Sequence, residues 1–174
     1  MRHLSFIIAI LLITNQEAFS QTDTMAGKKG LMFSFSGLNL GGGVGGKYWC
    51  PNGYALRAQI NGNYMKRIGQ SYESDMVSLS LGIEKHIDVS SELSPYCGAS
   101  LAFSRTSDLD IYYNKLISYA VNVYGFVGVE LWIHKSISLS GEQGLLLTHS
   151  TSENKQSTLY LRTSTSSLTL MVYF

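Results

Sequence analysis

Charged residues, linker sequences and long apolar runs are all scarce in this chain of 174 residues. Only 14% of the residues are charged, which indicates that much of the protein surface avoids water. The formal net charge is +1 and lysine and arginine are not clustered. A nucleic-acid partner is therefore excluded, because phosphate binding needs a concentrated positive patch. No proline-rich or serine-rich linker interrupts the chain, so its length indicates a single domain.

An apolar run at the N-terminus extends from Leu4 to Ile13 and is preceded by Arg2. It is too short to cross a bilayer as a helix, which takes about 20 residues. Ala18 and Ser20 supply small residues at the two positions that a signal peptidase inspects. These features predict a signal peptide cleaved after Ser20. No second apolar stretch of about 20 residues follows, which excludes a helical membrane span.

Alternation of apolar and polar residues is the dominant pattern in the rest of the chain. From Ile117 to Ile133 the odd-numbered residues are apolar or glycine, while Asn122 and Glu130 lie on the opposite parity. This run is much longer than the roughly 5 or 6 residues of a typical soluble strand. The pattern predicts eight strands. They are Leu31 to Leu38, Gly42 to Cys50, Tyr54 to Met65, Met76 to His86, Pro95 to Arg105, Ile117 to Ile133, Ser136 to Thr148, and Ser167 to Phe174, with an earlier start of the last strand left open.

The connections between these strands alternate in length. The mostly short ones are Pro51-Asn52-Gly53, Ile87 to Ser94, and His134-Lys135. The long, polar ones are Arg67 to Asp75, Thr106 to Leu116, and His149 to Ser166, and only the short first connection breaks the rule. Short turns at one end and long loops at the other, with an even number of strands, are typical of a bacterial transmembrane β-barrel.

Aromatic residues are spaced to border an apolar band. Tyr54 and Tyr64 share the outward parity, and ten residues of a tilted strand rise about 25 Å, the height of such a band. The predicted aromatic girdle consists of Tyr48, Tyr54, Tyr64, Phe103 and Tyr119. Aromatic rings prefer the membrane interface. The alternative is that these are ordinary core aromatics of a soluble barrel.

Charged residues within the predicted strands fall on the inward parity. They are Lys47, Arg57, Glu84, Glu130 and Glu142. An unpaired charge inside the barrel would cost several kcal/mol, so we expect one mutually satisfied network that also includes Gln59, Asn61 and inward serines. The interior of an eight-stranded barrel is just wide enough for side chains to fill. The sequence therefore predicts a filled cylinder rather than a pore.

Three blocks together resemble the OmpA/OmpX-type outer-membrane β-barrel family. They are the glycine-rich stretch Leu38 to Trp49 followed by Ala55 to Ala58, the block Gly128 to Ile133, and the terminal Phe174. The resemblance implies an all-β, eight-stranded antiparallel up-and-down barrel that is monomeric and surrounded by outer-membrane lipids. It also implies insertion by the outer-membrane assembly machinery, with Tyr173 and Phe174 as the C-terminal assembly signal. The chain then divides into a signal peptide (1–20), a short periplasmic segment (21–30) and the barrel (31–174).

The family resemblance implies little about activity, because one small-barrel architecture serves many functions. We expect a structural or surface-interaction protein that acts through its extracellular loops on an unidentified ligand, not an enzyme. No cofactor is predicted, and His86, His134 and His149 lack the spacing of metal ligands. Cys50 and Cys97 lie on non-neighbouring strands with outward parity, which favours two free, lipid-facing thiols.

Two alternative functions stay open. One is modification of outer-leaflet lipid by a set near the extracellular rim, namely His149, Ser150, Ser152 and Glu153. Adjacent residues of an extended segment point to opposite faces, so Ser150 is badly placed to act with His149 as a nucleophile. The other alternative is a carrier that passes small apolar molecules through a lateral opening. The only feature that indicates such a carrier is the abundant glycine of the first two strands. A tightly packed barrel wall explains this glycine content equally well.

Overall fold

Strands make up nearly all of the computed structural model, which describes residues 25–36, 41–66, 73–87, 92–109, 115–152, 156–163 and 167–174. The strands are β1 (Lys29–Ser36), β2 (Gly41–Trp49), β3 (Tyr54–Lys66), β4 (Glu73–His86), β5 (Leu93–Leu109), β6 (Lys115–His134), β7 (Ile137–Ser152), β8 (Ser157–Thr163) and β9 (Ser167–Tyr173). The predicted signal peptide lies outside the described residues. Within the described ranges, no helix is long and apolar enough to cross a membrane.

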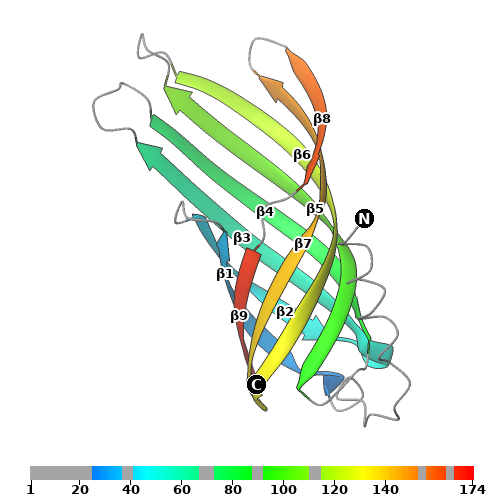
Figure 1. The fold of residues 1–174 in the computed structure, drawn as a ribbon. Helices are drawn as coiled ribbons and strands as arrows, with labels where there is room; N and C mark the ends of the chain where they lie inside the picture. Colours follow the sequence, from blue (N-terminus) through cyan, green and yellow to red (C-terminus); the bar gives the residue numbers. More distant parts are fainter. Residues whose placement is uncertain are drawn as a thin grey trace, which may run out of the picture.

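The strands close into an antiparallel barrel (Figure 1). Each strand from β1 to β7 pairs with its neighbour in the chain, and β9 pairs with both β7 and β1. The ring therefore contains eight strands, β1 to β7 and β9. The predicted fold class is confirmed.

Beside β7, the place of the eighth strand is taken by two segments, β9 and β8, at different heights. Residues Ile137–Glu142 of β7 pair with β9, whereas Leu145–Thr151 pair with β8. The predicted loop from His149 to Ser166 is therefore wrong, since β7 continues to Ser152 and β8 follows. The other long loops also lose residues to β4, β5 and β6, all of which extend beyond their predicted ends. A strand that pairs with a long neighbouring strand can continue into polar sequence, because the pairing stabilises it there. Such sequence shows little hydrophobic alternation, so it was not predicted as strand.

The two ends of the barrel differ in their connections. At one end, a turn at Pro51–Gly53 joins β2 to β3, and a turn at Lys135 and Ser136 joins β6 to β7. Asn52 and Gly53 have φ angles of 62° and 72°, a left-handed conformation that suits these two residue types. The backbone of Lys29 also bonds to that of Phe174 at this end. We call it the terminal end and the opposite one the loop end.

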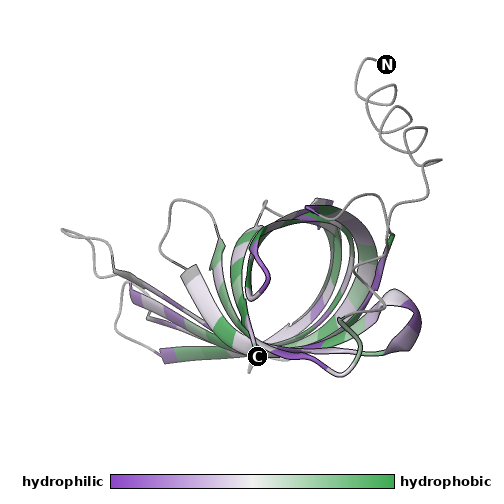
Figure 2. Ribbon diagram, turned by 90° about the horizontal axis from the view of Figure 1, so that it is seen from below, coloured by the Kyte–Doolittle hydropathy of each residue, from purple (hydrophilic) through white to green (hydrophobic). Residues whose placement is uncertain are grey.

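The outer face of the wall is apolar. Outward residues such as Leu81, Val127 and Leu145 are exposed by 59, 64 and 56%, while the intervening positions face the lumen. Figure 2 shows the ring of strands with hydrophobic and hydrophilic residues alternating along them. This inversion of the usual burial pattern is what a wall immersed in an apolar solvent requires.

Among the described residues, the ring of paired strands is complete only toward the terminal end. Strands β1 and β2 have 8 and 9 residues, whereas β4 to β7 have 14 to 20. The last pair between β2 and β3 is Gly42 with Gly62, so Asn63–Lys66 has no partner on that side among the described strands. Among the described strands, β8 pairs with β7 alone. At the loop end the described wall therefore has a gap between β3 and β8.

Aromatic rings fill the lumen at the terminal end because glycine makes room for them. Gly30, Gly98 and Gly128 pair across strands with Tyr173, Phe126 and Tyr96. A Cβ added to Gly30 would lie 2.7 Å from the Tyr173 ring, and one added to Gly98 would lie 2.6 Å from that of Phe126. A Cβ on Gly128 would likewise overlap Tyr96. Each ring lies over a backbone that carries no side chain, which lets large groups fit a narrow cylinder.

Candidate functional site

The centre of the filled half is Lys47, whose ammonium is completely buried. Its Nζ lies 2.9 Å from an oxygen of Glu84 and 2.9 Å from one of Glu130. His86 completes the arrangement, with Nε2 3.1 Å from Lys47 Nζ and 2.9 Å from Glu84 Oε2. These side chains come from β2, β4 and β6, so the contacts tie three parts of the wall together across the lumen.

A second ion pair continues this group toward the loop end. Arg57 Nη1 and Nη2 lie 2.7 and 3.3 Å from the two carboxylate oxygens of Glu142, a bidentate geometry that is stronger than a single contact. Arg57 Nη1 also lies 3.6 Å from Glu84, and its guanidinium lies over the Phe126 ring at 4.0 Å. The structure thus brings together all five charged residues that the sequence places inside the barrel. We call them, with His86, the lumen charge cluster.

The cluster also has neutral partners, of which the serines were expected and the two tyrosines were not. Tyr173 Oη donates to Glu130 Oε1 at 2.7 Å, and Tyr96 Oη donates to Glu142 Oε2 at 3.3 Å. The Ser138 hydroxyl also donates to Glu130, and His86 Nδ1 lies 3.0 Å from Ser94 Oγ. Their inward parity was visible in the sequence, but parity alone does not say which inward residues meet. Tyr173, which the resemblance assigns to the assembly signal, faces the lumen, whereas Phe174 is exposed by 73%.

The cluster is suited to hold the barrel together rather than to react. Every carboxylate in it contacts a cation and further hydrogen-bond donors. Removing one partner of such a buried pair typically costs about 3 to 5 kcal/mol, because the other charge stays buried without compensation. The rings of Trp49, Trp132 and Tyr173 pack against one another beside the cluster at the terminal end.

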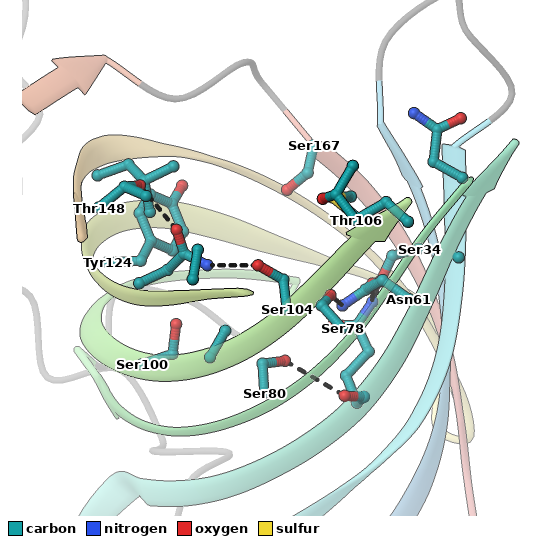
Figure 3. A pocket seen from close by; sticks show the side chains of 18 of the residues that line it. Ser34, Asn61, Ser78, Ser80, Ser100, Ser104, Thr106, Tyr124, Thr148 and Ser167 are labelled. Carbon is teal, nitrogen blue, oxygen red and sulfur yellow. Dashed lines mark hydrogen bonds between the residues drawn. The ribbon is translucent and has the colours of Figure 1, made fainter. Parts of the chain in front are cut away.

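The other half of the lumen is hollow. A cavity of about 480 Å³ extends from Arg57 and Glu142 toward the loop end. The described side chains thus leave open space in this half, where we expected them to fill it. Most of its lining side chains carry a hydroxyl or an amide (Figure 3), namely Ser34, Gln59, Asn61, Asn63, Ser78, Ser80, Ser100, Ser104, Thr106, Ser118, Asn122, Tyr124, Thr148, Ser150, Tyr160 and Ser167. These side chains are mostly small and leave the middle of this half unfilled by the described residues. We call this space the loop-end cavity.

Hydrogen bonds fix part of the cavity wall. Asn122 Nδ2 donates to Ser104 Oγ at 3.2 Å and Thr148 Oγ1 donates to Asn122 Oδ1 at 2.7 Å. Gln59 Nε2 lies 2.6 Å from both Ser34 Oγ and Asn61 Oδ1. Gln59 and Asn61, which we expected in the charge network, belong instead to this neutral wall.

The predicted girdle residues all lie on the outer face. Tyr48 and Tyr54 lie toward the terminal end and are exposed by 44 and 43%. Tyr64, Phe103 and Tyr119 lie farther toward the loop end and are exposed by 57 to 60%. Cys97 is also exposed on this face, Cys50 is partly buried beside the turn, and neither forms a disulfide.

His149 has a serine partner that the sequence argument overlooked. Its Nε2 lies 2.8 Å from Ser157 Oγ on the neighbouring strand β8. Ser150 lines the loop-end cavity, on the opposite face from the exposed His149, as expected from the alternation. Glu153 lies outside the described residues. The pair was missed because Ser157 was placed in a loop.

No family model and no curated relative matches this chain. Solved structures do: Neisserial surface protein A is 16% identical over 84% of this chain and 94% of its own, with a TM-score of 0.59. The N-terminal β-barrel domain of Pseudomonas aeruginosa OprF is 11% identical over 86% and 98%, with a TM-score of 0.56. A major outer membrane protein from Thermus thermophilus is 13% identical over 84% and 98%, with a TM-score of 0.54. The chain therefore has the fold of small outer-membrane β-barrels.

Proposed function

We propose that this protein is an integral outer-membrane β-barrel that acts as a structural or surface-interaction protein through its loop end. The apolar outer face carries the proposal. Along β6, the outward residues between Lys115 and Lys135 are all uncharged. On β4, Val77 to Ile83 form a similar outward row between Asp75 and Lys85. A soluble barrel with so many exposed large apolar side chains would aggregate.

The height and borders of the apolar face also support a membrane location. On β3, ten residues separate Tyr54 from Tyr64, a rise of about 25 Å for a tilted strand. The ammonium of Lys85 lies 4.5 Å from the centre of the Tyr54 ring. Tyr64 donates to Glu73 at 3.0 Å. Each ring thus has an apolar body beside a polar neighbour, as expected at a membrane interface.

The location is tested by fractionating cells that express the full chain and by gel electrophoresis with and without heating. We expect the protein in the outer-membrane fraction, with a folded form that migrates differently from the boiled one. Recovery of a folded protein entirely in the soluble periplasmic fraction would refute the proposal. Planar bilayers loaded with the protein should show no steady ion current, because the lumen charge cluster closes the terminal half.

The two last residues are proposed to act differently in assembly. Phe174 points outward and is exposed, so Phe174→Ala should lower the yield of inserted barrel in cells while leaving the stability of refolded protein unchanged. Tyr173→Phe removes the hydroxyl that donates to Glu130 and should lower stability instead. Unchanged insertion of Phe174→Ala would contradict its role as an assembly signal.

Hydrolysis of an outer-leaflet lipid is a second candidate, favoured by the contact between His149 and Ser157. In that reaction His149 would accept the Ser157 proton as the hydroxyl attacks an ester carbonyl, and would return it to the leaving alcohol when the ester C–O bond breaks. Water would then hydrolyse the acyl-Ser157 ester and release the fatty acid. Mass spectra of membrane lipids from cells with the protein should then show loss of an acyl chain, and Ser157→Ala should abolish it. Ser150→Ala, on the opposite face of β7, is the matched control. Identical lipid spectra with and without the protein would dismiss the activity.

A further inference from the structure

Two lysines on the outer face at the terminal end each lie opposite a tyrosine of the neighbouring strand. Lys29 of β1 pairs with Tyr48 of β2, and Lys85 of β4 pairs with Tyr54 of β3. All four positions continue the outward rows of their strands, and Lys29 and both rings are exposed. Strands β1 to β4 follow one another in the wall. The four residues therefore form one surface, which we call the lysine–tyrosine patch.

The positive charges of the patch are not neutralised by described carboxylates. Within the described ranges, every ion pair lies in the lumen charge cluster, so neither Lys29 nor Lys85 belongs to one. The Lys85 ammonium lies 4.5 Å from the centre of the Tyr54 ring and donates to the Asn52 carbonyl in the adjoining turn. Because an ammonium has three N–H donors, these contacts position the charge and leave donors for an anion.

The apolar wall begins directly beside the patch. Leu56 pairs with Tyr48 on one side and with Ile83 on the other, and both aliphatic side chains are exposed on the outer face. At the far end of the same two strands the charge is reversed, since Tyr64 pairs with Asp75 and donates to Glu73 at 3.0 Å. Of the two ends of the β3–β4 pair, only the terminal end therefore suits an anion that is attached to an apolar chain.

We propose that the lysine–tyrosine patch binds the phosphate groups of anionic phospholipids in the leaflet at the terminal end. The acyl chains of these lipids lie along Leu56 and Ile83. A lysine near the membrane surface attracts anionic headgroups, each contact strengthening binding by roughly fivefold, and tyrosine rings lie at the level of the headgroups. This proposal rests on the proposed membrane location, because only a wall embedded in a bilayer presents the patch to a leaflet.

The test uses the full barrel in phosphatidylcholine nanodiscs with increasing phosphatidylglycerol at constant total lipid, monitored by the amide NMR signals of Tyr48 and Tyr54. We expect shifts that saturate and that weaken at high salt, because salt screens exposed charges. Lys29→Gln/Lys85→Gln should raise the phosphatidylglycerol fraction at half-saturation by roughly fivefold. Lys29→Arg/Lys85→Arg keeps both charges and should leave that fraction close to the value of the unchanged protein.

Arg105→Gln/Lys115→Gln is the matched control, because it removes two positive charges at the loop end and should leave the titration unchanged. Equal weakening by the two glutamine double variants would mean that overall charge attracts the lipid, and would overturn the proposal. So would the absence of saturable shifts, or the same shifts with free glycerol phosphate in pure phosphatidylcholine nanodiscs. A chain that does not enter nanodiscs would refute the proposed membrane function and this proposal together. A chain that inserts without binding phosphatidylglycerol would overturn this proposal alone.

Discussion

The two halves of the lumen are built from the same inward-facing rows of the same strands, yet one is packed and the other is hollow. Toward the terminal end, Lys47 contacts two carboxylates at 2.9 Å, among buried tryptophan and tyrosine rings. Toward the loop end, serine and threonine leave a cavity of about 480 Å³. The difference teaches that barrel width sets only the available space, while side-chain volume along each row decides whether it is filled.

The wall follows the same division. The packed half has a continuous ring of paired strands, whereas the hollow half has a gap between β3 and β8 among the described residues. Stability is therefore expected to reside in the terminal half, and ligand contacts in the loop half. Many proteins place binding regions on their less stable segments in this way.

Lys47→Met tests the packed half with the largest expected effect. The free energy of unfolding should fall by about 3 to 5 kcal/mol, because Glu84 and Glu130 stay buried without their shared ammonium. Unfolding by guanidinium in detergent micelles measures this value. The double variant Lys47→Met/Glu130→Gln should recover part of the loss, since one uncompensated carboxylate is then neutral. A loss below about 1 kcal/mol, the size of a surface pair, would show that the cluster is solvated.

Val127→Lys compares the outer face with the lumen. A lysine on the lipid-facing side near the midplane should cost roughly 2 to 4 kcal/mol. Ser78→Lys should cost clearly less, because Ser78 lines the polar loop-end cavity, where the ammonium has room and water. Both values come from reversible folding into liposomes. Equal losses would contradict the assignment of the two faces.

Gly128→Ala tests the packing of rings against glycine. Its Cβ would overlap the Tyr96 ring and approach Gly141 O at 2.8 Å, so we expect a loss of about 1 to 3 kcal/mol. Gly125→Ala on the same strand is the control, because its Cβ meets nothing within 4 Å, and it should not destabilise. If both variants unfold at the same denaturant concentration, the terminal half is less tightly packed than described.

Thr148→Val should have the smallest effect, and it tests the hollow half. It removes the hydrogen bond to Asn122, which has a length of 2.7 Å. The expected loss of stability is about 1 kcal/mol, because water in the cavity can replace the lost partner. A loss as large as that of Lys47→Met would mean that the loop half is also a closed core.

Much of the wall could be predicted from the sequence, because every second residue of a long strand is apolar and these residues must share one apolar environment. Strands β3 to β7 follow from this pattern, and so does the inward placement of Lys47 and Glu130. Strand β8 could not be predicted, since Leu159 and Leu161 alternate with Tyr160 and Arg162 over only 7 residues. Its formation depends on pairing with β7, which is a long-range contact.

The partners inside the lumen were harder to predict than the faces. Lys47 lies on β2 and Glu130 on β6, so their contact depends on the stagger of strands that are not neighbours. The cavity depends on the summed volumes of the side chains that face the lumen at each height. In the loop half these include the small Ser78 and Ser100, whereas the terminal half contains the bulky Trp49. The alternation shows whether a side chain faces the lumen or the outside. It does not show how far along the barrel the side chain lies, or which residue it contacts.

Cysteine accessibility tests the central claim most directly, in a background with Cys50→Ser and Cys97→Ser. Single cysteines replace Ala102 in the loop-end cavity, Ala55 in the packed half, and Leu101 on the outer face. In liposomes, a membrane-impermeant maleimide should label only the cysteine at 102. Labelling at 55 as fast as at 102 would contradict the division of the lumen, and fast labelling at 101 would contradict the membrane-facing wall.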